Sequence, residues 1–449
     1  MSKLKLKTWQ IVTLAVGALI IVTGLFSYQI GLSASRGISG GKAAIITLGI
    51  VIAIVGVLGR KTFAAYKAVA IMLLNTILLL VFIEFSLVII ARLSDFLPHQ
   101  SETVVERDLR YINDGREDLL YYQAQDWSKD YWREYHAAWD GRVLPFEPYV
   151  LWRSKPFEGK ILNINAEGLR VTPGAECTPD SYTVFTFGGS TMWGTGVPDW
   201  GTIPAFLQSA LAEQMGRPVC VINYAEQAWV STQSVIQLML ALRAGNIPDL
   251  VIFYDGNNDV FAAYQSSKAG APQNLSSIAA RFEDRPEEPP LIALLSKTRT
   301  YKLLQRLVLG EDYKLIPPYE AQGVDANTLA AEVSQTYLGN YEIVQRLSSA
   351  YEFDAYFFWQ TTLLVDEKQL TEEEQSIKDV AISVYPGYVE LFDLTTEHVR
   401  SAISQYPDLH DLSGIFRDRS ELIFIDPFHV TIEGNQMIAS AMLNAIQGR

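Results

Sequence analysis

The sequence predicts an α/β fold: a three-layer α/β/α sandwich with a five-stranded parallel sheet, preceded by three transmembrane helices. Two observations support this prediction. Three long stretches within the first 99 residues carry almost no charge, and from about residue 180 short apolar segments alternate with segments of helical pattern. Such alternation is typical of parallel strands that are covered by helices on both faces. We therefore expect a membrane anchor at residues 1–99, an aromatic-rich lead-in at 100–179 and an α/β domain at 180–449.

The anchor rests on the three uncharged stretches. Residues 8–35 and 43–59 contain no charged side chain, and residues 68–91 contain only Glu84. Each stretch approaches or exceeds the roughly 20 residues that cross a bilayer. Lysine and arginine are concentrated before the first stretch and between the second and third, so the positive-inside rule places the chain after residue 92 outside the cytoplasm. We expect a multi-pass protein of the cell membrane, in which Glu84 lies near the outer interface or faces a neighbouring helix.

Charge is distributed unevenly between these regions. Residues 1–99 hold nine of the 36 basic residues and two of the 50 acidic ones, so the remainder of the chain is strongly acidic. A domain of this charge is unsuited to binding nucleic acid or an anionic membrane surface. Neutral or cationic partners fit it better.

The two cysteines both lie beyond the anchor. Cys177 precedes the first predicted strand and Cys220 lies at the start of the second. If those strands are parallel neighbours, the two sulfurs are within reach of a disulfide, although two buried free thiols would give the same pattern. Neither cysteine has neighbours spaced as metal ligands, and no cofactor motif is present, so we expect neither a metal nor a cofactor.

The lead-in is rich in aromatic residues without clean periodicity. Nine tyrosines and tryptophans fall between residues 121 and 152. They could stack on sugars or lie at lipid headgroups, but packing against the following domain is the more common role of such residues.

Five short apolar segments supply the predicted sheet. They are residues 183–187, 219–223, 250–254, 355–359 and 422–425. Helical patterns accompany them at residues 203–215, 232–244, 327–350, 389–406 and 432–446. With right-handed crossovers, the functional site should lie along the carboxyl ends of the strands. An insertion at about 264–325 is too long for a simple connection and could form a lid, a wall of the cleft or a surface excursion.

Chemically useful side chains follow these strands. Ser190 comes after the first strand, Asn258 after the third, and Asp426 and His429 after the fifth. A serine needs an adjacent imidazole as base, and a carboxylate on the other ring nitrogen orients that imidazole. The oxyanion of an acyl-transfer intermediate needs donors already in place, here the backbone N–H groups of Ser190 and Ala228 and the amide of Asn258. The competing pair His410 and Asp411 does not follow a predicted strand.

These residues resemble the SGNH hydrolases, also called GDSL esterases and lipases. The matching blocks, in the family's order, are Gly188-Gly189-Ser190, Gly256-Asn257-Asn258-Asp259 and Asp426-Pro427-Phe428-His429. The resemblance implies a flavodoxin-like sandwich, a catalytic triad of Ser190, His429 and Asp426, and an oxyanion hole from Ser190, Ala228 and Asn258. It covers the chain from about residue 180 to the C-terminus.

The chain departs from the family pattern at two positions. Ala228 stands where the family has glycine, and Gly189 stands where the family has aspartate. A backbone N–H survives the first exchange if the backbone angle suits alanine. The resemblance implies a membrane-anchored, extracytoplasmic serine esterase or deacylase that acts on acyl esters, with cell-envelope carbohydrate as the expected substrate. The alternatives are an O-acyltransferase to a polysaccharide and a non-catalytic carbohydrate-binding or assembly module.

Overall fold

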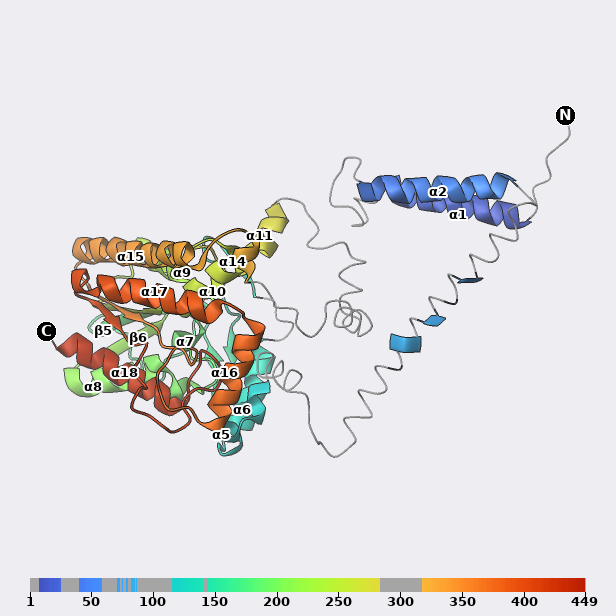
Figure 1. Cartoon of the computed structure of the whole chain (residues 1–449). Coiled ribbons are helices and arrows are strands. Elements are labelled where there is room, and N and C mark those ends of the chain that lie inside the picture. The colour runs from blue at the N-terminus through green and yellow to red at the C-terminus, as the bar shows by residue number, and fades with distance from the viewer. Residues whose placement is uncertain are drawn as a thin grey trace. The chain divides into compact units, whose positions relative to one another are not determined.

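The computed structural model separates the chain into two units (Figure 1). One comprises residues 1–100 and 276–314, and the other comprises residues 101–275 and 315–449. The structure describes residues 8–25, 40–58, 115–139, 144–282 and 317–448, with scattered positions between 71 and 86.

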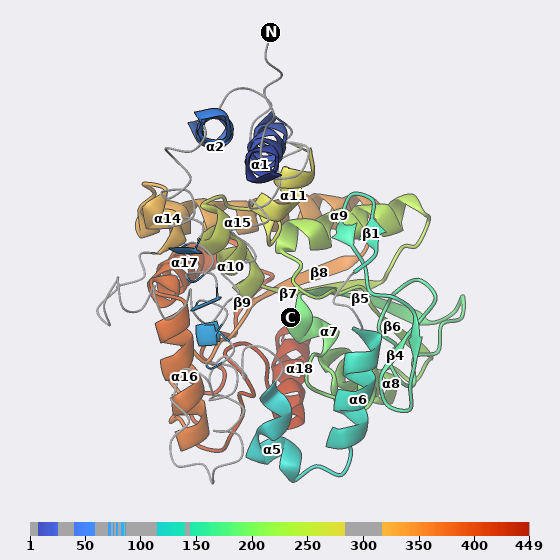
Figure 2. The same ribbon diagram turned by 90° about the vertical axis from the view of Figure 1, so that its right-hand side faces the viewer.

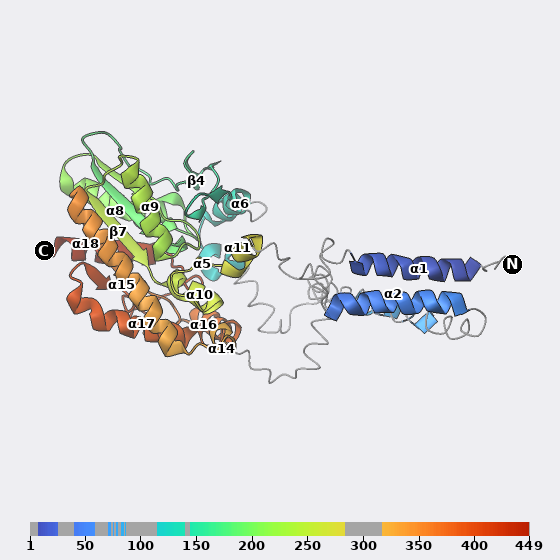
Figure 3. The ribbon, with the colours of Figure 1, turned by 90° about the horizontal axis from the view of Figure 1, so that it is seen from above.

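In the first unit, α1 (Thr8–Leu25) and α2 (Gly40–Leu58) lie side by side (Figure 3). The Gln10 side chain donates to the Gly56 carbonyl oxygen at 3.1 Å. A Cβ atom on Gly17 would lie 2.8 Å from the Ala53 nitrogen, so the helices approach closely at glycine.

The three predicted transmembrane helices are not confirmed. Within the described part of the chain, none of the helices has both the length and the apolar character that crossing a bilayer requires. Most of the third predicted span, residues 68–91, lies outside the described residues.

The second unit is built on the predicted five-stranded parallel sheet. Its strands are β5 (Tyr182–Gly188), β6 (Val219–Asn223), β7 (Leu250–Asp255), β8 (Asp354–Trp359) and β9 (Leu409–Asp411). They lie in the order β6-β5-β7-β8-β9, and every neighbouring pair is parallel. The first four coincide with predicted strands to within one residue at each end.

The fifth predicted strand is wrong. Residues 422–425 form only an isolated antiparallel bridge from Phe424 to Val430, and β9 takes the edge of the sheet. The backbone N–H groups of Ile423 and Phe424 instead donate to Glu374 Oε1 at 3.0 and 3.1 Å. Ile423 and Phe424 are buried, as the apolar run predicted, but a carboxylate rather than a neighbouring strand accepts from their backbone N–H groups.

Helices cover both faces of the sheet (Figure 2). Val184 and Ile252 point to the face covered by α8 (Ile203–Met215) and α18 (Ile432–Gln447). Phe185 and Phe253, one position later on the same strands, pack in the opposite core with side chains of α9 (Ser231–Arg243), α15 (Ala326–Tyr351) and α17 (Tyr388–Ala402). Successive strand residues alternate between faces, so this pairing produces the expected three-layer sandwich. All five predicted helices are present.

Shorter elements complete the unit. The helices are α5 (Leu120–Gln123), α6 (Ser128–Ala138), α7 (Ser190–Trp193), α10 (Asn257–Ser266), α14 (Pro318–Ala321) and α16 (Glu372–Val384). A further helix, α11 (Leu275–Phe282), belongs to the first unit except for its first residue. The 3-10 turns are η2 (Gly115–Asp118), η4 (Asp199–Gly201) and η5 (Ile403–Gln405). The small hairpins are β1 (Phe146–Glu147) with β2 (Leu151–Trp152) and β3 (Phe157–Glu158) with β4 (Asn163–Ile164). Residues 283–316 of the expected insertion lie outside the described residues, so its role stays a prediction.

Most of the aromatic side chains of the lead-in pack inward. Tyr122, Tyr131 and Trp132 are buried in the core that also contains α8 and α18. The Tyr122 and Trp132 rings meet edge to face with centroids 5.1 Å apart. Tyr149 and Phe146 are exceptions among the described lead-in aromatics, at 69% and 73% exposed. Packing is therefore the main role of the lead-in aromatics.

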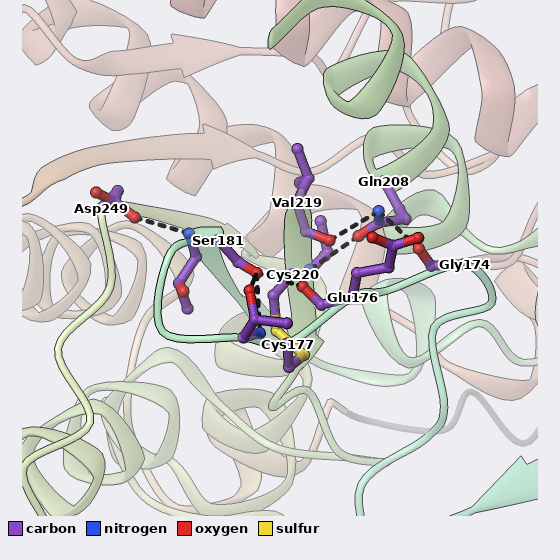
Figure 4. The surroundings of a disulfide bond; sticks show 11 residues. Gly174, Glu176, Cys177, Ser181, Gln208, Val219, Cys220 and Asp249 are labelled. Atoms are coloured by element: carbon purple, nitrogen blue, oxygen red, sulfur yellow. Dashed lines mark hydrogen bonds between the residues drawn. A yellow bond between two sulfur atoms is a disulfide. The ribbon is translucent and has the colours of Figure 1, made fainter. Parts of the chain in front are cut away.

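Cys177 and Cys220 form a disulfide at the amino end of the sheet (Figure 4). Cys220 lies in β6 beside Thr183 of β5. The Gln208 side chain of α8 donates to the carbonyl oxygens of Gly174 and Val219, each at 3.0 Å. The segment that carries Cys177 is thus held against β6 by hydrogen bonds as well as by the covalent bond.

Candidate active site

Ser190 is the first residue of α7 and is separated from the end of β5 by Gly189 alone. The last residue of β5 needs to be glycine, because a Cβ atom on Gly188 would lie 2.4 Å from the Tyr254 carbonyl oxygen of the neighbouring strand β7. Ser190 therefore stands at the carboxyl edge of the sheet, as the sequence predicted.

Asp426 and His429 lie on a tight turn before α18. The Ile425 N–H donates to the His429 carbonyl oxygen at 2.9 Å, which closes the turn. Asp426 Oδ1 accepts from the backbone N–H groups of Phe428 and His429 at 2.8 and 2.7 Å. This arrangement aims the Asp426 carboxylate at the His429 ring.

The three predicted triad residues are in contact. His429 Nδ1 lies 2.6 Å from Asp426 Oδ2, and His429 Nε2 lies 2.7 Å from Ser190 Oγ. Both distances are those of hydrogen bonds. The turn of residues 425–430 and the end of β5 are far apart in sequence, and the fold brings their side chains into one chain of hydrogen bonds.

Neighbouring charges keep the Asp426 carboxylate ionised. Burial raises the pKa of Asp426, but its contacts with His429 and Arg116 outweigh burial and hold that pKa well below its usual range. Arg116 Nη1 donates to Asp426 Oδ2 at 2.9 Å, and the two side chains are each 8% exposed.

The predicted oxyanion donors gather beside Ser190. Ala228 has a φ of 61°, a left-handed backbone that favours the glycine expected there. Asn258 Nδ2 donates to the Trp229 carbonyl oxygen at 2.8 Å, and its Oδ1 accepts from Gln273 at 2.9 Å. A Cβ atom on Gly189 would lie only 2.1 Å from Asn258 Nδ2, so the amide occupies the space of the missing side chain.

One cavity of about 240 Å³ unites these residues. It is lined by all five predicted site residues, Ser190, Ala228, Asn258, Asp426 and His429. Its further lining residues, which the sequence did not predict, include Arg116, Gln227, Phe261, Gln273, Tyr385 and Phe428. Burial raises the pKa of Tyr385, as does the nearby Asp426 carboxylate, so the phenol is neutral around pH 7.

Sequence reasoning missed these residues for different reasons. Arg116 lies in η2, in a segment without periodicity, and its partner Asp426 is 310 residues away in the chain. Phe261 lies on α10, one turn after Asn258, a spacing that places two side chains on the same side of a helix. That spacing was the one available signal.

The competing histidine lies elsewhere. His410 is in β9, where its ring stacks on Phe358 with centroids 5.3 Å apart, and it does not line the cavity. Asp411 pairs with Arg400 at 2.5 Å rather than with His410. Across the described residues, no cluster of three histidine, cysteine or acidic side chains is placed to hold a metal ion.

Comparison with known proteins gives one family match. The family model described as GDSL-like Lipase/Acylhydrolase matches residues 184–442. A search of curated proteins found no match.

Among solved structures, the lipase Lip_vut3 from a goat rumen metagenome is 12% identical, with a TM-score of 0.35, and the match covers 59% of this chain and 97% of that one. A lipolytic G-D-S-L family protein from Veillonella parvula is 12% identical, with a TM-score of 0.33, and the match covers 60% and 98% of the two chains. The acetylxylan esterase Axe2 from Geobacillus stearothermophilus is also 12% identical, with a TM-score of 0.33 and coverage of 62% and 97%.

Proposed function

The chain belongs to the GDSL-like lipase/acylhydrolase family and is a serine ester hydrolase, and we propose that Ser190, His429 and Asp426 are its catalytic triad. The observation that carries this proposal is the pair of short distances, 2.7 Å from Ser190 Oγ to His429 Nε2 and 2.6 Å from His429 Nδ1 to Asp426 Oδ2. The ionised Asp426 accepts a hydrogen bond from His429 Nδ1–H, which keeps the proton on Nδ1 and leaves Nε2 free to act as a base.

The reaction follows from this geometry. Ser190 Oγ attacks the acyl carbonyl carbon while its proton passes to His429 Nε2. The carbonyl oxygen becomes an oxyanion, which the backbone N–H groups of Ser190 and Ala228 and the Asn258 amide stabilise. The C–O bond to the alcohol then breaks, and the alcohol leaves with the proton from His429. In the second half of the reaction, water attacks the acyl-serine carbonyl carbon while its proton passes to His429 Nε2. The bond to Ser190 Oγ then breaks, Oγ takes the proton back from His429, and the carboxylic acid is released.

For the substrate, we propose an acyl ester of a cell-envelope carbohydrate. The cavity offers aromatic faces from Phe261, Tyr385 and Phe428 and side-chain amides from Gln227 and Gln273. Aromatic faces and amides together suit a sugar ring, which has apolar faces and hydroxyl edges. The cavity volume of about 240 Å³ favours a short acyl chain.

For the location, we propose that residues 1–99 anchor the chain in the cell membrane and that the catalytic unit lies outside the cytoplasm. The distribution of lysine and arginine around the apolar stretches supports this orientation. The disulfide between Cys177 and Cys220 supports an oxidising compartment. Labelling of intact cells with a membrane-impermeant fluorophosphonate tests this location, and labelling that requires cell lysis would contradict it.

Fluorophosphonate labelling also tests the triad. The probe reacts with activated serines, so we expect it to label the native chain but neither Ser190→Ala nor His429→Ala. The matched control is Ser209→Ala, which removes an exposed serine on α8 that does not line the cavity. We expect this variant to label like the native chain. Undiminished labelling of a folded Ser190→Ala variant would refute the proposal.

A further inference from the structure

The Asp426 carboxylate has a second side-chain partner besides His429, and this partner carries a positive charge. Oδ1 accepts the two backbone N–H groups of the turn, and Oδ2 accepts both His429 Nδ1 and Arg116 Nη1. The Arg116 guanidinium is supplied by η2, in the lead-in, and not by the α/β domain that carries the triad. The carboxylate is therefore held from two sides by groups that are far apart in the sequence.

Arg116 is itself fixed in place. Its guanidinium lies over the Trp132 ring, 5.2 Å from the centroid, and 5.9 Å from the centroid of Tyr135. Both rings belong to α6, whose aromatic residues pack into the core. A planar guanidinium held between aromatic rings and a carboxylate has little freedom to turn, so it can define the position of Asp426 Oδ2.

Three tyrosines near the pair carry no charge at neutral pH. Burial raises the pKa of Tyr122 and of Tyr131, which lie near Arg116. On the other side, Tyr385 lines the same cavity and its pKa is also raised by burial and then by Asp426. Of the described residues that line this cavity, Asp426 and Arg116 bring a negative and a positive charge to the His429 ring.

We propose that Arg116 is a positioning residue for ester hydrolysis. It holds Asp426 against His429, and its own positive charge disfavours a positive charge on the nearby imidazole. This inference rests on the proposed triad. The ion pair fixes the carboxylate that orients His429, so its loss should lower the rate of the chemical step. Arg116 Nη1 and His429 Nδ1 contact the same carboxylate oxygen, so the positive charge of Arg116 partly offsets the negative charge of Asp426 at the imidazole.

Steady-state kinetics across pH separate this role from a purely structural one. Arg116→Met removes the charge and keeps the length of the side chain. On p-nitrophenyl acetate we expect kcat to fall about 10- to 100-fold with KM changed by less than about twofold. We expect the acid limb of the kcat/KM profile to move up by about one pH unit. Arg116→Lys, which keeps the charge, should retain the native acid limb and regain most of kcat.

The matched control removes another ion pair of the lead-in. Lys160 pairs with Asp130 at 2.9 Å on the surface, and Lys160→Met should leave kcat and the acid limb unchanged. If Arg116→Met does not fold, Arg116→Gln replaces it, because glutamine keeps a donor for Asp426 without the charge and should show the same shift in pH. A folded neutral variant with native kcat and a native acid limb would overturn the inference.

A spectroscopic titration keeps this inference separate from the proposed function. In protein labelled with ¹⁵N-histidine, the His429 ring signals are those that disappear in His429→Ala. Their titration midpoint should move up by about one pH unit in Arg116→Met. If the native chain hydrolyses no ester and Ser190 takes no label, the proposed function fails. The titration still shows whether the charge of Arg116 acts on the His429 ring. An unmoved midpoint would refute that action.

Discussion

The space at Gly189 gives the sharpest test of the oxyanion site. In Gly189→Ala, the new Cβ atom would lie 2.1 Å from Asn258 Nδ2, whereas ordinary contacts begin at 3.4 Å. The Asn258 amide must therefore move by about 1 Å or more, because close-packed atoms cannot overlap. Gly189 has a φ of −86°, so alanine meets no strain from the backbone angle itself. The substitution thus acts through Asn258.

The expected loss follows from the contacts of Asn258. Displacement removes one proposed oxyanion donor, which typically costs 10²- to 10³-fold in kcat, or about 2.7–4 kcal/mol of transition-state stabilisation. It also breaks the 2.8 Å hydrogen bond to the Trp229 carbonyl oxygen, which should cost about 0.5–1.5 kcal/mol of unfolding free energy. Gly189→Asp, which introduces the aspartate that the family resemblance leads one to expect, should be at least as damaging because its side chain is larger.

The assay is kcat and KM on p-nitrophenyl acetate together with urea unfolding. The control is Gly339→Ala on α15, where a Cβ atom would meet nothing within 4 Å. Gly339→Ala should keep native kcat and gain about 0.5–1 kcal/mol of stability, since glycine disfavours a helix interior. A folded Gly189→Ala variant with native kcat would show that Asn258 is not needed where the structure places it.

Four further predictions concern the scaffold and the position of Ala228. Glu374→Ala should lower the free energy of unfolding in urea by about 3–5 kcal/mol, because it leaves the buried Lys368 ammonium, 2.6 Å away, without its carboxylate partner. Adding Lys368→Met should restore part of this loss. Purely additive losses in the double variant would contradict the prediction. Although burial raises the pKa of Glu374, Lys368 and backbone donors lower it overall, so this stabilisation should fade as the pH falls below about 4.5, as urea unfolding at several pH values would show. Ala228→Gly should keep kcat within about twofold and leave the melting temperature unchanged or higher, because a φ of 61° strains alanine by about 1 kcal/mol; a clear drop in either would argue against the glycine-like position. Replacing Cys177 and Cys220 by alanine should cost about 4 kcal/mol in urea, given their separation of 43 residues, and an unchanged midpoint would refute that estimate.

The sheet could be predicted where its strands are apolar on both faces. β7 is buried along its whole length, and the sequence of residues 250–254 shows this directly. β9 could not be found in this way, because it is a three-residue edge strand that contains His410 and Asp411. The apolar run at 422–425 competed with β9 and is more deeply buried than it, but hydrophobicity reports burial and not the partner of the backbone.

In the candidate site, too, some residues could be predicted from the sequence and others could not. Ser190, Asn258 and His429 could be predicted because each follows a recognisable segment and because their chemistry is specific. Arg116 could not, since an arginine in an aromatic-rich stretch has many ordinary roles and its contact with Asp426 spans 310 residues. Local patterns identify groups that react, whereas groups that support them from a distance appear only in the folded chain.

The origin of Arg116 in the lead-in sets a limit on how the enzyme can be dissected. The family match begins at residue 184, which makes that boundary an obvious place to cut the gene for expression. A fragment that starts there would leave the Asp426 carboxylate without its guanidinium and expose the face that α5 and α6 cover. An inactive or aggregated fragment of that kind would say nothing against the intact enzyme, and recombinant protein for any assay should start upstream of residue 115.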